Sequence, residues 1–412
     1  MKTSNKLYFL YFIVISQFTI AISPYFYDLI IILFYILLSL KSSDFKLNKY
    51  LLISLGIFVS FSILHEIRYY GNDFAIFPKS LYSDLRPFLF LALLYDLLKN
   101  LDVKYNFILN ILLLNVSINF IFNLIGYINS DLYRKLVTLI FNDSYIIIQY
   151  SENNGFPTSL AYMSSLQNRF CGAYIQPISA GLSSSFVILI IIFLLRNQKY
   201  NSKVFLILIF SIFNGLVSYS TMFHLLPLFL LIWFIISKVN VYILLSIIFL
   251  FITLIIFTLP FIDINEFSLL FFTLTSGRYS TDGNIAGVLL TKNFNFIDIL
   301  FGFDPYSIGH EGKGVGDSGF FIKWISGGII YIFLYFIMLY KNITYFIKKL
   351  STNENIYFNH FFNFIFFIFL LVELGTTPFS LPQFSIFFYL VFLLVLKLCS
   401  SHESKLVLKK FI

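Results

Sequence analysis

The chain alternates long apolar runs with short polar connections. The runs consist mainly of Leu, Ile and Phe, and they are continuously apolar rather than apolar at every second residue. A helix that crosses a bilayer needs about 20 apolar residues, and only helices and closed barrels pair every backbone polar group inside lipid. Because barrel strands alternate apolar and polar positions, the pattern predicts an all-α polytopic integral membrane protein with about 12 (11 to 13) helices.

The expected helices follow the apolar runs, and the run at 86–98 is short for a complete span. Their expected ranges are 7–23, 25–40, 50–64, 86–98, 106–128, 178–195, 203–219, 222–237, 241–262, 319–340, 357–373 and 379–397.

Composition supports this class and the basic residues predict its orientation. Hydrophobic residues make up 59% of the 412 residues and charged residues only 12%, against roughly 25% charged residues in a soluble domain. The net charge of +8 comes from short clusters of Lys and Arg between apolar runs, so it predicts topology and not a nucleic-acid partner. With both termini in the cytoplasm, the inner connections carry most of the 28 basic residues, as the positive-inside rule requires.

This topology places the longest polar sequences on the outer side. We expect a single membrane domain over 1–412, with one long periplasmic loop at 129–177 and a second at 263–318. A medium loop at 65–85 lies on the same side. The expected working surface is therefore outside the bacterial inner membrane, where a cytosolic nucleotide is not an expected substrate.

Each long loop supplies one arginine suited to binding phosphate oxygens. Arg169 lies shortly before the helix that follows Pro177, and Arg278 lies in a Ser-Gly-Arg sequence. A guanidinium presents a fixed fork of donors that matches phosphate geometry. We expect Arg169 and Arg278 to converge on one pyrophosphate. The alternative is that each is an ordinary interfacial charge, paired with a lipid headgroup or a loop carboxylate.

The end of the second long loop offers candidates for a general base. Asp317 comes two residues before an apolar helix, and His310 and Glu311 lie close to it in sequence. A carboxylate or imidazole beside a sugar hydroxyl can remove its proton. Asp317 ranks first because the start of the helix would hold it rigidly. Its alternative role is that of an acidic residue stabilising a helix amino terminus.

Further charged residues border the apolar segments. Arg68 and Arg86 flank the medium outer loop, and Glu373 lies at the outer end of an apolar run, so we expect these three to line a cavity. Asp28 and Asp96 lie close enough to helix ends to be interfacial. Intramembrane acids are functional candidates by default, and a proton-coupled transporter would also use them.

Other motifs do not support cofactor or metal chemistry. Residues 314–319 read G-x-G-x-x-G, but the dinucleotide fingerprint requires a preceding strand, and this copy lies in an outer loop. We find no D-x-D sequence and no Walker loop, and therefore expect neither a metal nor a cofactor. Cys171 and Cys399 fall on opposite sides of the predicted membrane, so no disulfide between them is expected.

The ordered set of loop motifs resembles the Wzy-type O-antigen polymerases. The motifs are Arg-x-x-Gly-x-x-x-x-Pro at 169–177, Ser-Gly-Arg at 276–278, Leu-Phe-Gly at 300–302, Asp-Ser-Gly at 317–319 and Ser-Gly-Gly at 326–328. The helical architecture is similar along the whole chain, while the motifs cover about sixty residues. The resemblance implies a fold like that of GT-C-type glycosyltransferases.

The resemblance also implies a reaction and its partners. The enzyme would be a metal-independent inverting glycosyltransferase that joins oligosaccharide repeat units linked to undecaprenyl pyrophosphate, at the periplasmic face of the inner membrane. Arg169 and Arg278 would stabilise the pyrophosphate leaving group, and a polysaccharide chain-length regulator would be a possible protein partner. Membrane lipid would surround the helices, which would hold the polyprenyl tails.

Two other functions stay open from the sequence. An O-antigen ligase, which transfers the finished chain to lipid A-core, carries a His near the end of the second loop, where this chain has Asp317 but also His310. A flippase for lipid-linked oligosaccharides would spread charged residues through many helices. Such residues are sparse here, which favours the polymerase.

Overall fold

The computed structural model describes the chain in several stretches. These are residues 3–16, 24–39, parts of 52–64, 77–140, 164–174, 176–197, 201–226, 229–230, 232, 296–302, 319–350, 356–372 and 382–400.

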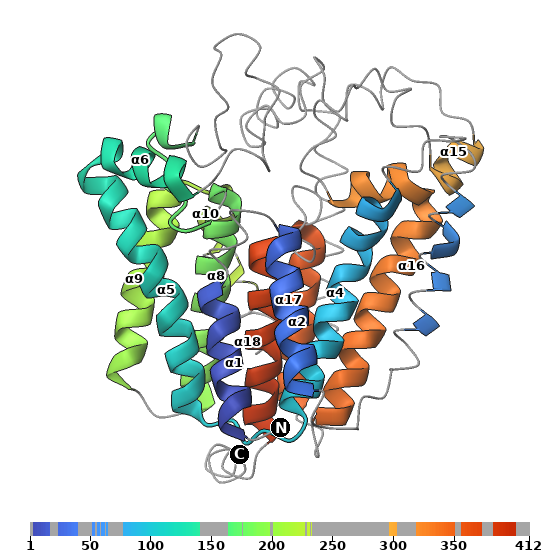
Figure 1. Cartoon of the computed structure of the whole chain (residues 1–412), viewed down its shortest axis with the longest axis horizontal. Coiled ribbons are helices and arrows are strands. Elements are labelled where there is room, and N and C mark those ends of the chain that lie inside the picture. The colour runs from blue at the N-terminus through green and yellow to red at the C-terminus, as the bar shows by residue number, and fades with distance from the viewer. Residues whose placement is uncertain are drawn as a thin grey trace, which may run out of the picture.

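Every regular element in these stretches is a helix (Figure 1), in agreement with the predicted all-α class. The helices are α1 (Thr3–Ile15), α2 (Pro24–Ser39), α4 (Phe77–Leu98), α5 (Tyr105–Ile128), α6 (Ser130–Ile140), α8 (Pro177–Asn197), α9 (Ser202–Ser218), α10 (Thr221–His224), α15 (Phe296–Phe301), α16 (Gly319–Leu350), α17 (Ile356–Val372) and α18 (Pro382–Ser400).

Several of these helices are long and apolar enough for a membrane. Within the described residues, the segments Tyr105–Ile128, Pro177–Leu195 and Gly327–Leu350 each have the length and hydropathy needed to cross a bilayer. Shorter apolar helices lie beside them. The chain is therefore a helical membrane protein. The predicted helices at 50–64 and 222–237 are described only in part, and the one at 241–262 lies outside the described residues.

Two helices extend beyond their predicted ranges. The helix expected at 86–98 begins at Phe77 and continues through Pro87, because its first turns carry polar residues that a hydropathy reading assigns to a loop. The helix expected at 319–340 continues to Leu350. Its last turn contains Lys348 and Lys349, where positive charge interacts favourably with the helix dipole.

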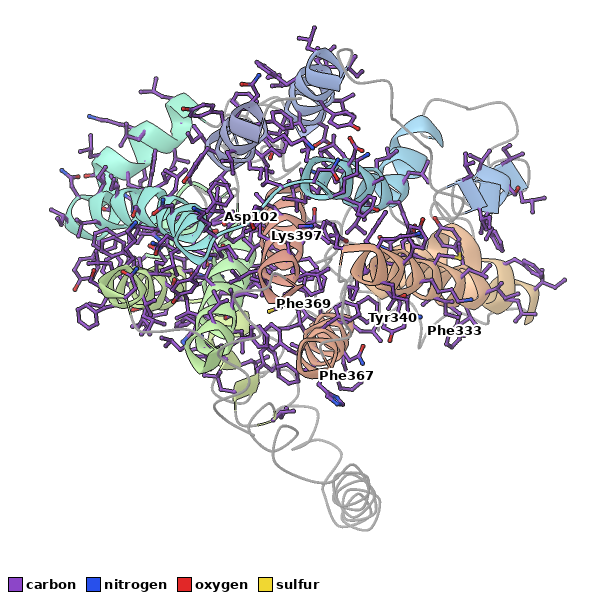
Figure 2. All side chains as sticks on the ribbon, turned by 90° about the horizontal axis from the view of Figure 1, so that it is seen from below. Asp102, Phe333, Tyr340, Phe367, Phe369 and Lys397 are labelled. Carbon is purple, nitrogen blue, oxygen red and sulfur yellow. The ribbon has the colours of Figure 1, made fainter. Side chains whose placement is uncertain are left out.

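Helix α18 forms the centre of the bundle. It packs against α5 and α8 on one side and against α4 and α16 on the other (Figures 1 and 2). Its side chains from Phe384 to Leu396 are all buried. A helix that is apolar on every face is suited to such a position. The two flanking groups of helices are therefore held together through α18.

Aromatic side chains make much of the contact between helices. Phe186 of α8 lies 5.1 Å from Phe388 and 6.0 Å from Phe369, measured between ring centroids. Phe193 stacks on Phe361 at 4.1 Å. Inside lipid the hydrophobic effect does not drive helices together, so close van der Waals contact must do so. The many Phe residues serve this purpose by offering large flat contact surfaces.

The lower end of the bundle in Figure 1 gathers basic residues from helices that are distant in sequence. Lys6 donates to the carbonyl oxygen of Asp96 (3.5 Å), and Lys99 pairs with the Asp96 carboxylate (2.6 Å). Lys397 donates to the carbonyl oxygen of Lys99 (3.1 Å), and Figure 2 shows Lys397 and Asp102 near the middle of this end. These lysines therefore share one end, as their common assignment to the inner side requires.

Candidate functional site

The upper end of the bundle is formed by α6, α10, α15 and the start of α16 (Figure 1). Residues 164–174, which carry Arg169, lie at this end against α5, α6 and α9. A small separate core fixes the segment in place; its buried members are Tyr133, Val137, Phe170, Cys171, Tyr174, Ala180 and Val217.

Residues 164–174 are hydrogen-bonded to the carboxyl end of α9. The backbone nitrogen of Phe170 donates to the carbonyl oxygen of Val217 (3.1 Å). The half-buried Arg169 donates through Nε to the carbonyl oxygen of Ser218 (3.5 Å). The last carbonyls of a helix lack partners within the helix and carry partial negative charge, so a cation is stabilised there. Arg169 is thus positioned by a helix end.

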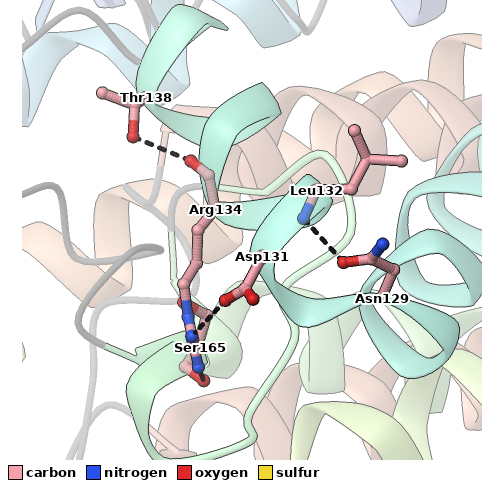
Figure 3. A network of polar contacts seen from close by, with 6 residues as sticks. All are labelled: Asn129, Asp131, Leu132, Arg134, Thr138 and Ser165. Atoms are coloured by element: carbon pink, nitrogen blue, oxygen red, sulfur yellow. Dashed lines mark hydrogen bonds and ion pairs between the residues drawn. The ribbon is translucent and has the colours of Figure 1, made fainter.

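Helix α6 holds the same segment from the other side. The Tyr133 hydroxyl accepts from the backbone nitrogen of Cys171 (3.1 Å) and donates to the carbonyl oxygen of Gly172 (3.3 Å). Arg134 donates to the Ser165 hydroxyl (3.3 Å) and to its carbonyl oxygen (3.2 Å), and it also pairs with Asp131 (2.9 Å), as Figure 3 shows. The predicted first long loop therefore contains a helix that the hydropathy reading missed.

The glycine and proline of the Arg-x-x-Gly-x-x-x-x-Pro sequence have clear structural roles. Gly172 has φ +63°, and a Cβ there would lie 2.7 Å from the Asn119 side-chain oxygen. That oxygen accepts from the backbone nitrogen of Ala173 (2.9 Å). Pro177 is the first residue of α8, a position that tolerates the missing N–H of proline. Each conspicuous residue of the motif therefore shapes or anchors the segment that presents Arg169.

A polar network continues from this segment into the bundle. The Tyr174 hydroxyl donates to Ser183 (2.6 Å), and Asn115 contacts the same hydroxyl (3.4 Å). Nearer the upper end, between α5 and α9, Asn123 donates to the side-chain oxygen of Asn214 (2.9 Å). Buried amides and hydroxyls are costly unless paired. The network therefore fixes α5, α8 and α9 relative to one another beneath Arg169.

The Cys171 thiol and the Tyr133 hydroxyl, which help to hold residues 164–174 in place, are poorly suited to catalysis. Burial raises the pKa of the Cys171 thiol to about 12, against the lowering effect of the Arg169 cation. Burial also raises the pKa of the Tyr133 hydroxyl well above its ordinary value. A thiol must be deprotonated to act as a nucleophile. Cys171 and Tyr133 are therefore structural at neutral pH.

His224 is a candidate that the sequence reading missed. It is the last residue of α10 and is exposed at the same end as Arg169. Its Nδ1 lies 2.8 Å from the carbonyl oxygen of Ser220. Because a carbonyl can only accept, Nδ1 carries the hydrogen, and Nε2 of the neutral ring is an acceptor. Arg169 and His224 thus contact carbonyls two residues apart, those of Ser218 and Ser220.

Two other sequence motifs meet at a second place on the upper end. Gly328 has φ +73°, where α16 changes direction, and a Cβ there would overlap the carbonyl group of Leu300 at the end of α15. Gly302, just after α15, has φ +84°. The Leu-Phe-Gly sequence at 300–302 and the Ser-Gly-Gly sequence at 326–328 therefore belong to one contact. Sequence alone gave no reason to pair them.

The first part of α16 carries a buried cation. The Lys323 side chain is buried, and its Nζ lies 4.3 Å from the centroid of the Tyr335 ring and 6.0 Å from that of Phe336. A cation over an aromatic face is attracted by the ring quadrupole. A lysine within an apolar segment is itself a signal for such a site. The sequence reading did not select Lys323.

Arg86 lies inside the bundle and is paired with Asp28. It donates through Nε and Nη2 to the two Asp28 carboxylate oxygens (2.6 and 3.0 Å) and through Nη1 to Ser385 (3.0 Å). Both charged side chains are buried. Asp28, which was expected near a helix end, lies in the first turns of α2 and is turned inward onto the arginine of α4.

The other predicted site residues are Arg68, Arg278, His310, Glu311, Asp317 and Glu373, and all of them lie outside the described residues. Convergence of Arg169 with Arg278 therefore stays a prediction. Among the residues that the structure describes, no group of three or more His, Cys, Asp and Glu side chains could hold a metal ion. Comparison of the chain with protein-family models, with curated proteins and with solved structures found no match.

Proposed function

We propose that this protein is an O-antigen polymerase of the Wzy type, located in the bacterial inner membrane with both termini in the cytoplasm. It joins oligosaccharide repeat units carried on undecaprenyl pyrophosphate at the periplasmic face. The observation that supports this most is the fixed presentation of Arg169 at one end of an apolar bundle. A preorganised cation at that position suits a lipid-linked pyrophosphate, whose charge lies at the membrane boundary.

The proposed reaction needs one anion site and one base. A hydroxyl oxygen of the acceptor repeat unit attacks the anomeric carbon of the donor chain, and the bond from that carbon to the pyrophosphate oxygen breaks. The configuration at the carbon inverts, the hydroxyl proton passes to a general base, and undecaprenyl pyrophosphate leaves with the bonding electrons. Arg169, together with Arg278, stabilises the charge that develops on the leaving group.

His224 joins Asp317, His310 and Glu311 as a candidate for the base. Its Nδ1–H is held by the Ser220 carbonyl, which leaves Nε2 as the acceptor nitrogen. A base held in this way by a hydrogen bond from its second nitrogen is the usual arrangement in acid–base catalysis. Replacing His224 by Asn keeps a donor near the position of Nδ1 and removes the acceptor. If His224 is the base, H224N abolishes polymerisation; a normal polymer ladder assigns the role to the second loop.

The buried charges give weaker support to a transporter. Arg86 has Asp28 and Ser385 as partners at hydrogen-bond distance. A flippase needs charges that exchange partners with the passing substrate, whereas this arginine is already neutralised by a carboxylate inside the bundle. We therefore keep the flippase as an outcome of the test below.

The test is the lipopolysaccharide banding pattern of a strain that lacks the gene. A polymerase deletion leaves lipid A-core carrying one repeat unit, while a ligase or flippase deletion leaves lipid A-core with none. Complementation with the unaltered chain restores the ladder. R169A leaves the single-repeat band, and R169K restores little because an ammonium lacks the planar fork. K135A is the matched control, since Lys135 is an exposed basic residue of nearby α6; it restores the full ladder.

A further inference from the structure

Helix α6 presents three distinct faces. The first faces the protein: Tyr133 and Val137, four residues apart, are buried against residues 164–174. The second is polar and exposed, and it consists of Asp131, Lys135 and Thr138. Residues three and four apart share one side of a helix, so each set forms a continuous stripe.

The third face of α6 is apolar, and within the described residues its two outer leucines are exposed while the middle one is half-buried. It consists of Leu132, Leu136 and Leu139, again spaced four and three residues apart. Leu132 is 46% exposed and Leu139 is 80% exposed. A two-faced helix would suffice for a protein surrounded by water, where one face is buried and the other is polar. A separate exposed leucine stripe, as the described residues show it, favours an apolar neighbour.

The leucine stripe continues the exposed apolar surface of a neighbouring span. Helix α5, a candidate membrane span, exposes Ile121 in its second half and Ile128 at its end, the latter to 75%. Asn129 alone separates α5 from α6, and its side-chain oxygen accepts from the backbone nitrogen of Leu132 (3.0 Å) in the first turn of α6 (Figure 3). The exposed surface of α5 therefore runs directly onto α6.

The orientation of α6 is also that of a helix lying in a membrane interface. In Figure 1 α6 lies across the upper end of α5, and in Figure 2 it is seen along its length at the edge of the bundle, while the long helices are seen nearly end-on. The helix thus lies roughly across the direction of the spans. Helices that lie within a membrane interface have this direction and insert their apolar face at the boundary of headgroups and acyl chains.

We propose that α6 is an interfacial helix that binds the lipid bilayer, with Leu132, Leu136 and Leu139 in the acyl region. The neighbouring polar stripe faces water and headgroups. Lipid is the occupant that we assign to the surface, because the stripe directly follows the exposed face of a candidate membrane span.

The contact has a consequence that rests on the proposed function. Tyr133 and Arg134 of the same helix bind the segment that carries Arg169. A helix held in the interface therefore fixes Arg169 at the depth of the lipid phosphates, which is also the depth of a polyprenyl pyrophosphate. The lipid contact itself needs no enzymatic activity, so its test is independent of the reaction.

The test compares two adjacent positions on different faces of α6. The full chain, with Trp233 and Trp324 replaced by Phe, receives either Leu139→Trp or Thr138→Trp. Each variant is placed in vesicles of phosphatidylcholine and phosphatidylglycerol whose acyl chains are unmodified or brominated near the headgroup. Bromine quenches the tryptophan fluorescence of Leu139→Trp more strongly than that of Thr138→Trp, by a factor of about two or more. The reason is that only the leucine face enters the acyl region. Equal quenching of both variants, or stronger quenching of Thr138→Trp, overturns the proposal.

A second measurement leaves the native tryptophans in place. Leu139→Cys and Thr138→Cys are compared in the same vesicles with a water-soluble maleimide, with Cys399 replaced by Ser so that only the buried Cys171 remains as background. Thr138→Cys reacts at least about tenfold faster if Leu139 is in lipid, which excludes the reagent. Equal rates contradict the lipid contact, and they do so whether or not the protein polymerises sugar.

Discussion

The ion pair between Asp28 and Arg86 predicts a specific pattern of stability. Asp28 accepts two hydrogen bonds from Arg86, at 2.6 and 3.0 Å, and both side chains are buried. Charge-assisted hydrogen bonds contribute about 1.5–3 kcal/mol each, which gives about 3–6 kcal/mol for the two. Removing one member of a buried pair costs about 3–5 kcal/mol, because the other charge is left uncompensated. We expect D28L and R86M each to lose about this much unfolding free energy.

The double variant provides the decisive comparison. Replacing Asp28 by Leu and Arg86 by Met removes both charges, and such a replacement is often neutral or stabilising. Ser385 loses one hydrogen-bond partner, which costs about 1 kcal/mol of unfolding free energy. The double variant is therefore more stable than either single variant, and the substitutions are strongly non-additive.

The assay is titration of the purified protein with SDS in mixed micelles. With the partly exposed Cys399 replaced by Ser, a thiol-reactive dye reports unfolding, because the thiol of Cys171 is buried in the folded protein. D131N is the control: Asp131 pairs with Arg134 at the surface, and exposed pairs contribute only about 0–1 kcal/mol. A double variant whose loss equals the sum of the two single losses would refute the buried-pair account.

Three further predictions concern the upper end of the bundle. G172A destabilises the protein by about 1–2 kcal/mol, because a side chain disfavours the left-handed backbone and would crowd Asn119; SDS titration measures the loss, and the ladder shortens although Arg169 is intact. G328A loses more unfolding free energy than G172A in the same titration, since its Cβ also overlaps the Leu300 carbonyl. An equal or smaller loss of unfolding free energy would contradict that packing. Cys171 of the folded protein stays unlabelled by maleimide at pH 8, because burial raises its pKa to about 12; rapid labelling would show that the segment opens.

Long apolar helices could be predicted from sequence because their signal is local. The runs that became α5, α8 and α9 were expected at 106–128, 178–195 and 203–219, and the observed helices agree within a few residues. Each run has enough apolar residues in succession to be recognised without its neighbours. The sharing of one end by Lys6, Lys99 and Lys397 was also predictable, since it follows from counting spans.

Features that depend on weak local signals or on distant partners could not be predicted. Helix α6 has low overall hydrophobicity, so a window average hides its three faces. The Asp28–Arg86 pair joins residues 58 positions apart, and no local pattern gives their relative rotation. The motif around Arg169 could be selected from sequence, but its anchoring on the end of α9 depends on tertiary contacts.

The central claim is that this chain itself polymerises lipid-linked repeat units. The most direct measurement uses the purified protein in proteoliposomes, supplied only with the undecaprenyl-pyrophosphate-linked repeat unit that accumulates in the deletion strain. We predict a ladder of lipid-linked polymers with one undecaprenyl pyrophosphate released for each linkage formed. R169A gives no ladder, and K135A gives the full one. Absence of any polymer from the folded, unaltered protein, or equal polymer from R169A, would contradict the account.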